Sequence, residues 1–493
     1  MSNFIIYENG DEYTGKLKDG KRHGKGQMKY SDILSYHGNW KVGEKNGKGE
    51  LRLSLQDFFI LGGDDEKNIQ NQSDLFYSLR FKDDKYEKQE LCPMLQGKCL
   101  FGLEKYSHYL FIFGGFDGNR CIDNIDRYDF FTNKWENIAS LSERRSGCVS
   151  VIDSKNSKIY IIGGTQKGIV LNLIEEYDIL TNKCSNFITS KSKRTCGGAV
   201  YFEGKIYMFG GLKYTEDDLY MEILDLKEKK ITLKEHILLN IMGAGYCFGI
   251  MDSRPCIFVV GGDQKEGLNQ RHCYTNKFFY YDIQKDEIYE LPSPFHKRKY
   301  SSLVFHQQCL YLIGGYDGEK IVSDIEIFSL VEKKWEIKNT NIIDKCGSGV
   351  LAVDNEKFLL QGVWKNNLLE GKAKVFLNEK CISSGKYKKN KKEGYFDEES
   401  QIFYQNNLIL PEEELKLQKK LKRRRIPEQF ICPIGYEIMR NPVITSCGTT
   451  YEEKNIKKWL ETKNTDPLIR YEITDNLIPN LILKSLIQQY IEK

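Results

Sequence analysis

Six apolar segments that each end in Gly-Gly recur along the middle of this 493-residue chain and constrain its fold more than any other feature. The spacing between successive segments runs from 47 to 53 residues. Short strands of this kind cannot bury both faces alone, whereas stacking of successive repeats around an axis buries them. The pattern therefore predicts a ring of six blades. The first glycines of the pairs are Gly62, Gly114, Gly163, Gly210, Gly261 and Gly314.

The blade repeat also carries an aromatic signature. Tyr128 precedes Trp135 by seven residues, and a period of about 50 residues with Gly-Gly, Tyr and Trp resembles the kelch repeat, one propeller blade each. The same seven-residue spacing joins Leu79 with Tyr86, Tyr177 with Cys184, Leu224 with Ile231, Tyr281 with Ile288, and Phe328 with Trp335.

The ring also needs a closing strand. No strand of the type that precedes Gly-Gly is evident before Phe58, but "CGSGVLAVD" at 346–354 has that pattern. We expect it to complete the first blade of a six-bladed, kelch-type β-propeller over residues 55–358.

A shorter repeat precedes the blades. The stretches "YTGKLKDGKRHGKG" and "YHGNWKVGEKNGKG" start 23 residues apart and share four glycine positions. Closely spaced glycines suit hairpins whose turns need positive φ. Residues 1–54 are similar to two repeats of the MORN family, which builds a single-layer ribbon of stacked hairpins.

The same register returns after the blades. The stretches "QGVWKNNLLEGKA" and "SGKYKKNKKEGYF" place Asn367 and Asn390 where Gly43 stands. Asparagine is the best non-glycine residue at a left-handed position, so the turns are kept. We interpret 359–400 as two degenerate MORN-like repeats, which makes the propeller an insertion between two halves of one mainly β ribbon.

Composition narrows the class of protein. Forty-two glycines against ten prolines favour strands and turns, and a net charge of +4 does not argue for nucleic acid. Fourteen scattered cysteines favour reduced thiols, and neither a signal peptide nor an apolar membrane span is evident. We therefore expect a soluble, cytoplasmic protein. Residues 401–425 are predicted to be a charged linker or helix, and the basic run from Lys419 to Arg425 leaves nuclear import open.

Residues 426–493 have the layout of a zinc module. The stretch "CPIGYEIMRNPVITSCGTTYEEKNIKKWL" predicts a loop, a hairpin and a short helix capped by Thr450, with Asn480 capping a last helix. A structural zinc needs four N/S ligands, yet only Cys432 and Cys447 could serve and the segment has no histidine. We predict no metal and no cofactor.

This module resembles the U-box family over its full length, through "IPEQFICPI", "MRNPVIT", "GTTYE", "IKKWL", "DP" and "LIPN". The resemblance implies a small α+β, RING-like fold that is held by hydrogen bonds and salt bridges without zinc. It also implies a ubiquitin ligase, which binds a ubiquitin-charged conjugating enzyme and promotes transfer to a substrate lysine without a covalent ligase intermediate. The effect is positional, because the thioester is held in a near-attack arrangement.

The resemblance also assigns individual residues. It implies that Ile434, Tyr436, Trp459 and Pro467 grip the conjugating enzyme, and that Arg470 bridges that enzyme and ubiquitin. The alternatives from the residues alone are that Trp459 and Tyr436 are simply core, Pro467 only a turn residue and Arg470 a plain surface residue. Ile469 stands where the family usually has a small polar residue, which weakens the assignment of Arg470.

Basic residues recur just before the strand that precedes each Gly-Gly, with Met242 as the exception. They stand at equivalent points of the blades, so they could ring one mouth of the propeller and dock an acidic peptide. The alternative is that they pair structurally with neighbouring blades. The residues are Lys98, Arg145, Arg194, Lys299 and Lys345.

Two functions of different class follow. The favoured one is a ubiquitin ligase that recruits its substrate through the propeller. The alternative is a non-catalytic scaffold whose U-box no longer binds a conjugating enzyme. For the lysine-rich ribbon we expect a scaffold or self-association role before contact with anionic lipid.

Overall fold

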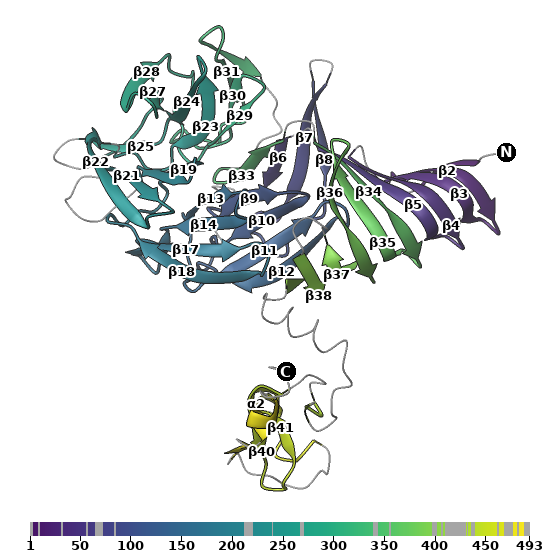
Figure 1. The fold of residues 1–493 in the computed structure, drawn as a ribbon. Helices are drawn as coiled ribbons and strands as arrows, with labels where there is room; N and C mark the ends of the chain where they lie inside the picture. Colours follow the sequence, from purple (N-terminus) through teal and green to yellow (C-terminus); the bar gives the residue numbers. More distant parts are fainter. Residues whose placement is uncertain are drawn as a thin grey trace. The chain divides into compact units, whose positions relative to one another are not determined.

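The computed structural model is mainly β and divides into two compact units, Met1–Gln401 with Asn406–Leu408, and Ile402–Gln405 with Ile409–Lys493. Figure 1 shows the first unit as a propeller with a ribbon of strands and the second as a small C-terminal module. The structure describes residues 3–7, 10–30, 33–55, 58–64, 72–82, 85–211, 220–238, 240–266, 271–338, 344–353, 356–396, 402–405, 408–409, 430, 432–434, 439–460, 463–467, 477–480 and 483–487.

Six antiparallel four-stranded sheets form the propeller, which confirms the predicted number of blades. From the inner to the outer strand, blade 1 is β33 (Gly349–Ala352), β6 (Phe58–Leu61), β7 (Phe76–Lys82) and β8 (Lys85–Glu90). Blade 2 is β9 (Gly102–Tyr106), β10 (Tyr109–Phe113), β11 (Asn124–Asp129) and β12 (Lys134–Ser140), and blade 3 is β13 (Val149–Asp153), β14 (Lys158–Ile162), β17 (Leu173–Asp178) and β18 (Lys183–Thr189).

The other three blades repeat this order. Blade 4 is β19 (Gly198–Phe202), β20 (Lys205–Phe209), β21 (Tyr220–Asp225) and β22 (Lys230–Leu238). Blade 5 is β23 (Gly245–Met251), β24 (Arg254–Val260), β27 (Phe278–Asp282) and β28 (Glu287–Leu291), and blade 6 is β29 (Ser302–His306), β30 (Cys309–Ile313), β31 (Ile325–Ser329) and β32 (Lys334–Lys338). Two small hairpins, β15 (Thr165–Gln166) with β16 (Ile169–Val170) and β25 (Asp263–Glu266) with β26 (Arg271–Tyr274), extend blades 3 and 5.

The ring closes as predicted. Strand β33 pairs with β6, with Gly349 opposite Leu61, so residues near 350 complete the first blade. Each inner strand also contacts the inner strand of the next blade, from β9 through β29 and β33 back to β9.

A cyclic chain of backbone hydrogen bonds also joins the blades. The residue two positions before the start of each inner strand has a left-handed conformation, with φ between 52° and 64°. Its N–H donates to the carbonyl oxygen of the equivalent residue one blade earlier, at N–O distances of 2.7 to 3.2 Å. Because every member donates once and accepts once, the six blades are linked in a closed circuit. The members are Leu100, Gly147, Cys196, Gly243, Tyr300 and Gly347.

The Gly-Gly repeat has a direct physical cause, because each pair lies against the backbone that leads into the next blade. A Cβ on Gly114 would stand 2.6 Å from the carbonyl oxygen of Arg145, and the Gly115 N–H donates to that oxygen at 2.8 Å. Gly261 and Gly262 meet Arg298 in the same way, at 2.6 and 2.8 Å. A side chain at the first glycine would push the blades apart.

The seven-residue pairs are direct cross-strand neighbours in blades 2 to 6, as for Tyr128 opposite Trp135. In blade 1 the second strand also begins as expected, with Tyr86 as the second residue of β8, but the register differs. Leu79 lies opposite Lys88, and Tyr86 lies opposite Phe81. Pairing in blade 1 continues to Lys82 opposite Lys85, three positions apart, whereas the last pair of blade 2 is Asp129 opposite Lys134, five positions apart.

The ribbon is one sheet built from both ends of the first unit, and Figure 1 shows its purple and green strands side by side. Strand β5 pairs with β34 in antiparallel register, with Gly49 opposite Gly362. In order, the strands of the first unit in this sheet are β1 (Asn3–Ile6), β2 (Glu12–Lys18), β3 (Lys21–Lys29), β4 (Leu34–Lys41), β5 (Glu44–Leu55), β34 (Glu356–Lys365), β35 (Leu368–Leu377), β36 (Lys380–Lys388) and β37 (Lys391–Phe396).

Asparagine replaces glycine in the ribbon turns as expected. Asn367 has φ of 64° and Asn390 of 66°, against 87° for Gly43. Asn367 also joins the two halves, because its N–H donates to the Lys45 carbonyl oxygen and its Oδ1 accepts from the Lys45 N–H at 2.7 Å.

The ribbon is attached to blade 2. The Lys105 ammonium of β9 forms an ion pair with Glu356 at the start of β34. The ring of Phe358 lies 6.0 Å from His108 and 6.2 Å from Phe131, measured between centroids. These contacts join propeller and ribbon.

The second unit contains β38 (Ile402–Gln405), β40 (Pro442–Ile444), β41 (Thr450–Glu452), β42 (Ile478–Pro479) and α2 (Glu453–Leu460). Residues 483–487 are helical, and Asn480 caps them as predicted, with its Oδ1 accepting from the Leu483 N–H at 3.0 Å. The predicted Thr450 cap of α2 is wrong, because Thr450 belongs to β41. Residues 410–429, which include most of the predicted linker, lie outside the described part of the chain. No helix in the described residues is long and apolar enough to cross a membrane.

Candidate functional site

A small apolar core supports the C-terminal module. Cys432, Val443, Tyr451 and Ile456 are buried in it together with Ile487. These side chains come from the first loop, the hairpin and both helical segments, so the core holds the loops of the module to α2.

The first polar network of this module centres on Asp466, whose side chain is fully buried. Its carboxylate accepts from the Tyr451 hydroxyl at 2.6 Å and from the Thr445 hydroxyl at 3.1 Å. Both donors belong to the hairpin of β40 and β41, so Asp466 ties the second loop to that hairpin.

The second network lies at the start of α2. The Glu452 carboxylate accepts from the backbone N–H groups of Arg440 and Asn441 at 2.7 and 2.9 Å. Cys432 Sγ accepts from the Glu452 N–H at 3.3 Å and from Asn455 Nδ2 at 3.6 Å. The thiol of Cys432 therefore serves as a buried hydrogen-bond acceptor. Among the described residues, no group of three or more His, Cys, Asp or Glu side chains is arranged to hold a metal.

The structure describes three of the five residues assigned by the U-box resemblance. Ile434 and Trp459 are half-buried and pack against the edge of the apolar core, and Pro467 is half-buried in the second loop. Trp459 Nε1 donates to the Thr465 carbonyl oxygen at 2.8 Å, which fixes the indole to the loop that carries Pro467. Tyr436 and Arg470 lie outside the described residues.

The predicted ring of exposed cations on the propeller is wrong for three of its five members. Lys98, Arg145 and Arg194 are at most 1% exposed. Each forms an ion pair with a buried carboxylate of its own blade, so none can face a docking peptide. Lys98 Nζ lies 2.6 Å from Asp126, Arg194 Nη2 lies 2.7 Å from Glu222, and Arg145 pairs with Glu175.

Sequence reasoning missed Arg298, the true equivalent of these residues in blade 6. Arg298 is fully buried, pairs with Glu326 and donates to the Gly314 carbonyl oxygen at 2.9 Å. The predicted residue of this blade, Lys299, is the neighbour of the true equivalent. The usable signal was the acidic residue that follows 28 to 30 positions later in all four blades.

Blade 5 replaces this ion pair with apolar side chains. Ile241 stands where blades 2, 3, 4 and 6 have a buried cation, and Phe279 stands where those blades have the carboxylate. Both side chains are buried in one apolar cluster.

Burial lowers the pKa of the guanidinium groups of Arg194 and Arg298, although their glutamates raise it.

Lys299 and Lys345, the other two predicted cations, are half-buried. Lys299 Nζ lies 4.8 Å from the centroid of Tyr274, 5.2 Å from that of Tyr300 and 5.8 Å from that of Tyr316. Blades 5 and 6 together therefore form a cluster of three tyrosines around one ammonium group.

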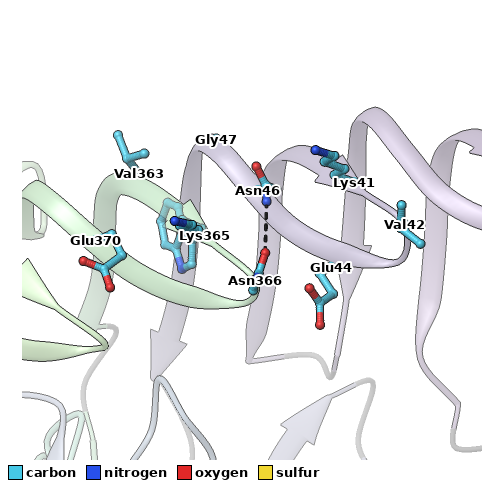
Figure 2. A pocket seen from close by; sticks show the side chains of 10 residues that line it. Lys41, Val42, Glu44, Asn46, Gly47, Val363, Lys365, Asn366 and Glu370 are labelled. Atoms are coloured by element: carbon cyan, nitrogen blue, oxygen red, sulfur yellow. Dashed lines mark hydrogen bonds between the residues drawn. The ribbon is translucent and has the colours of Figure 1, made fainter.

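A hollow of about 540 Å³ lies at the seam of the ribbon, between the β4–β5 and β34–β35 turns. Figure 2 shows Asn46 bonded to Asn366 across it, with Lys365 and Glu370 on one side and Lys41 and Glu44 on the other. None of the predicted site residues lines this hollow.

These features define a β-propeller protein that carries a U-box. The profile described as "Attractin/LZTR1 beta-propeller" matches residues 58–326, more than half of the chain, and the chain belongs to that family. The U-box domain profile matches residues 426–493, and the MORN repeat profile matches residues 13–32 and 36–54.

Three curated proteins illustrate the likeness of the U-box. "Probable bifunctional E2/E3 enzyme R795" of Acanthamoeba polyphaga mimivirus is 43% identical over 65 residues, which are 13% of this chain and 5% of that protein. "E3 ubiquitin-protein ligase PUB23" of Arabidopsis thaliana is 48% identical over 68 residues, 13% of this chain and 16% of that protein. "E3 ubiquitin-protein ligase SPL11" of Oryza sativa subsp. japonica is 45% identical over 69 residues, 14% and 10%.

The chain thus matches only 5% to 16% of the length of these relatives. Among solved structures, that of YjhT is 15% identical with a TM-score of 0.47, covering 58% of this chain and 98% of that one.

Proposed function

We propose that this chain is a ubiquitin ligase that binds a ubiquitin-charged conjugating enzyme through residues 426–493. The observation that carries the proposal is a U-box at 45% to 48% identity with proteins named as E3 ubiquitin-protein ligases. The buried network of Asp466 and the half-buried network of Glu452 support it, because they hold both loops of the module in a defined conformation.

The conjugating-enzyme contact comprises Ile434 on the first loop, Trp459 on α2 and Pro467 on the second loop, together with Tyr436 and Arg470. The hydrogen bond from Trp459 to Thr465 supports this grouping, because it couples the helix to the second loop. Half-buried apolar side chains that already pack against the module are partly ordered. They can therefore bury further area against a partner at little cost in conformational entropy.

The ligase supplies position and no nucleophile. A substrate lysine amine attacks the thioester carbon of the charged conjugating enzyme, the amide bond forms, and the enzyme's thiol leaves. Holding the thioester in a near-attack arrangement lowers the entropic part of the barrier. The Cys432 thiol is fully buried and already accepts two hydrogen bonds, so it is a poor candidate for a covalent role.

The propeller recruits the substrate in this proposal. With three of the predicted cations buried, Lys299 and its three tyrosines, together with Lys345, are the remaining candidates for an acidic partner. Substrate binding should therefore weaken in Lys299→Glu and remain in Lys297→Glu, an exposed neighbour.

Autoubiquitination of the purified full chain, with a panel of conjugating enzymes, tests the proposal. We expect activity with at least one enzyme, and loss of that activity in Ile434→Ala. Lys458→Ala changes an exposed residue of α2 and should leave the activity intact. Absence of activity with every enzyme, or full activity of Ile434→Ala, would favour the non-catalytic scaffold.

A further inference from the structure

The ribbon ends in an apolar edge strand. Strand β1 occupies one end of the ribbon sheet, and its residues Asn3–Ile6 include neither charge nor proline. Phe4 is 61% exposed and Ile6 is 64% exposed. Proteins usually protect such edges with lysine, proline or a bulge, so an unprotected edge favours pairing with another strand.

The pairing of β1 with β2 determines which backbone N–H and C=O groups of β1 face outward. The Tyr7 N–H donates to the Asp11 carbonyl oxygen at 2.8 Å, in the same register as the pairing of β1 with β2. Hydrogen-bonded pairs alternate along an antiparallel ladder, so Ile5 faces β2 and the N–H and C=O groups of Phe4 and Ile6 face outward. In the described part of the chain, no strand pairs with this outer edge.

We propose that β1 pairs in antiparallel fashion with β1 of a second copy of this chain, about a twofold axis at Ile5. In that register Phe4 lies opposite Ile6 of the second copy, and symmetry repeats the pair. The outward backbone groups of Phe4 and Ile6 then form four hydrogen bonds. Aromatic side chains opposite β-branched ones stabilise such pairs.

A second copy fits this edge better than an unrelated strand does. The register satisfies every outward group of Phe4 and Ile6 and covers both exposed side chains with each other. The pairing also continues the sheet in the way that β34 continues it beyond β5. An isologous contact of this kind closes after two copies.

The contact is small. Stable protein interfaces bury about 1,200–2,000 Å², which is more than two four-residue strands can bury. The dimer is therefore weak and depends on concentration. It would give a ligase or a scaffold two propellers and two C-terminal modules per assembly, and it does not depend on the proposed ligase activity.

Sedimentation velocity of the full chain over about 1–100 µM, the range where weak dimers dissociate, tests the proposal. We expect a dimer that Ile6→Pro removes, because proline deletes an outward N–H and spares the ladder to β2. Phe4→Lys should also give a monomer. Val42→Lys is the matched control, because Val42 is 57% exposed at the β4–β5 turn, away from β1. The Val42→Lys variant should still form the dimer.

A cross-linking experiment tests the pairing without relying on variants that could fail to fold. The twofold axis places the two copies of residue 5 opposite each other in a close, non-hydrogen-bonded pair, so Ile5→Cys should form a disulfide-linked dimer under oxidation. Phe4→Cys should form far less. A wild-type monomer at all concentrations, species larger than a dimer, or equal cross-linking of both variants would overturn the proposal.

Discussion

The buried cations of the propeller and two half-buried cations of the ribbon have different kinds of partner. In blades 2, 3, 4 and 6 a buried cation meets a buried carboxylate, as Arg194 meets Glu222. In the ribbon, Arg22 lies 4.5 Å over Trp40, and Lys45 lies between the rings of Tyr30 and Tyr36. Ion pairs tie two segments of a blade together, whereas aromatic rings let a single-layer sheet cover long basic side chains.

The largest effect should come from breaking one ion pair. Arg194→Met leaves the Glu222 carboxylate buried without its guanidinium, which should lower the free energy of unfolding by about 3–5 kcal/mol. Denaturant unfolding measures it. Lys193→Met, at the exposed neighbouring position, is the control and should change little.

The apolar pair of blade 5 indicates a second substitution that should offset part of the stability lost with the Arg194 ion pair. Arg194→Ile with Glu222→Phe copies the pair Ile241 and Phe279. The double variant should recover about 1–3 kcal/mol relative to the sum of the single changes. Recovery should be incomplete, because Glu222 also accepts from the backbone N–H groups of Lys191 and Ser192. A double variant as unstable as that sum would show that blade 5 is not equivalent.

A smaller effect is expected in the ribbon. Arg22→Met removes two guanidinium hydrogen bonds to the Gly43 carbonyl oxygen and the contact with Trp40, which should cost about 1–3 kcal/mol. Hydrogen exchange should speed up in β2 to β5 and stay unchanged in blade 4. Equal loss in both regions would contradict the contrast between propeller and ribbon.

The smallest effect is a pH dependence. Burial, with a lesser contribution from Arg22, lowers the pKa of Lys45 to about 8. Between that value and the unfolded pKa of about 10.4, the unfolded chain holds more protons, so stability rises as pH increases from 8 to 10. Lys45→Met should lack this rise, as measured by thermal unfolding across that range. An identical rise in Lys45→Met would contradict the lowered pKa.

Strict periodicity is what made most of the fold predictable. The six Gly-Gly pairs, the closing strand near 350 and the asparagine turns follow from spacing, because each repeat meets the same steric demand. The register of Leu79 could not be predicted, because the sequence does not show that β7 and β8 stay paired as far as Lys82 and Lys85.

The site was predictable only in part. Family motifs assign Ile434, Trp459 and Pro467, whereas the bond from Trp459 to Thr465 depends on tertiary packing. That the Arg145 side chain is buried could not be predicted from its neighbours in the sequence either, because its partner Glu175 lies 30 residues away. A basic residue beside a strand looks the same in sequence whether it faces solvent or a buried carboxylate.

Discharge of ubiquitin from a charged conjugating enzyme to free lysine, in a single turnover, tests the central claim most directly. We expect the full chain to accelerate the discharge and Ile434→Ala to abolish the acceleration, with no thioester of ubiquitin on the chain itself. Unaccelerated discharge with every conjugating enzyme tested, or a thioester on Cys432 or Cys447, would contradict the account.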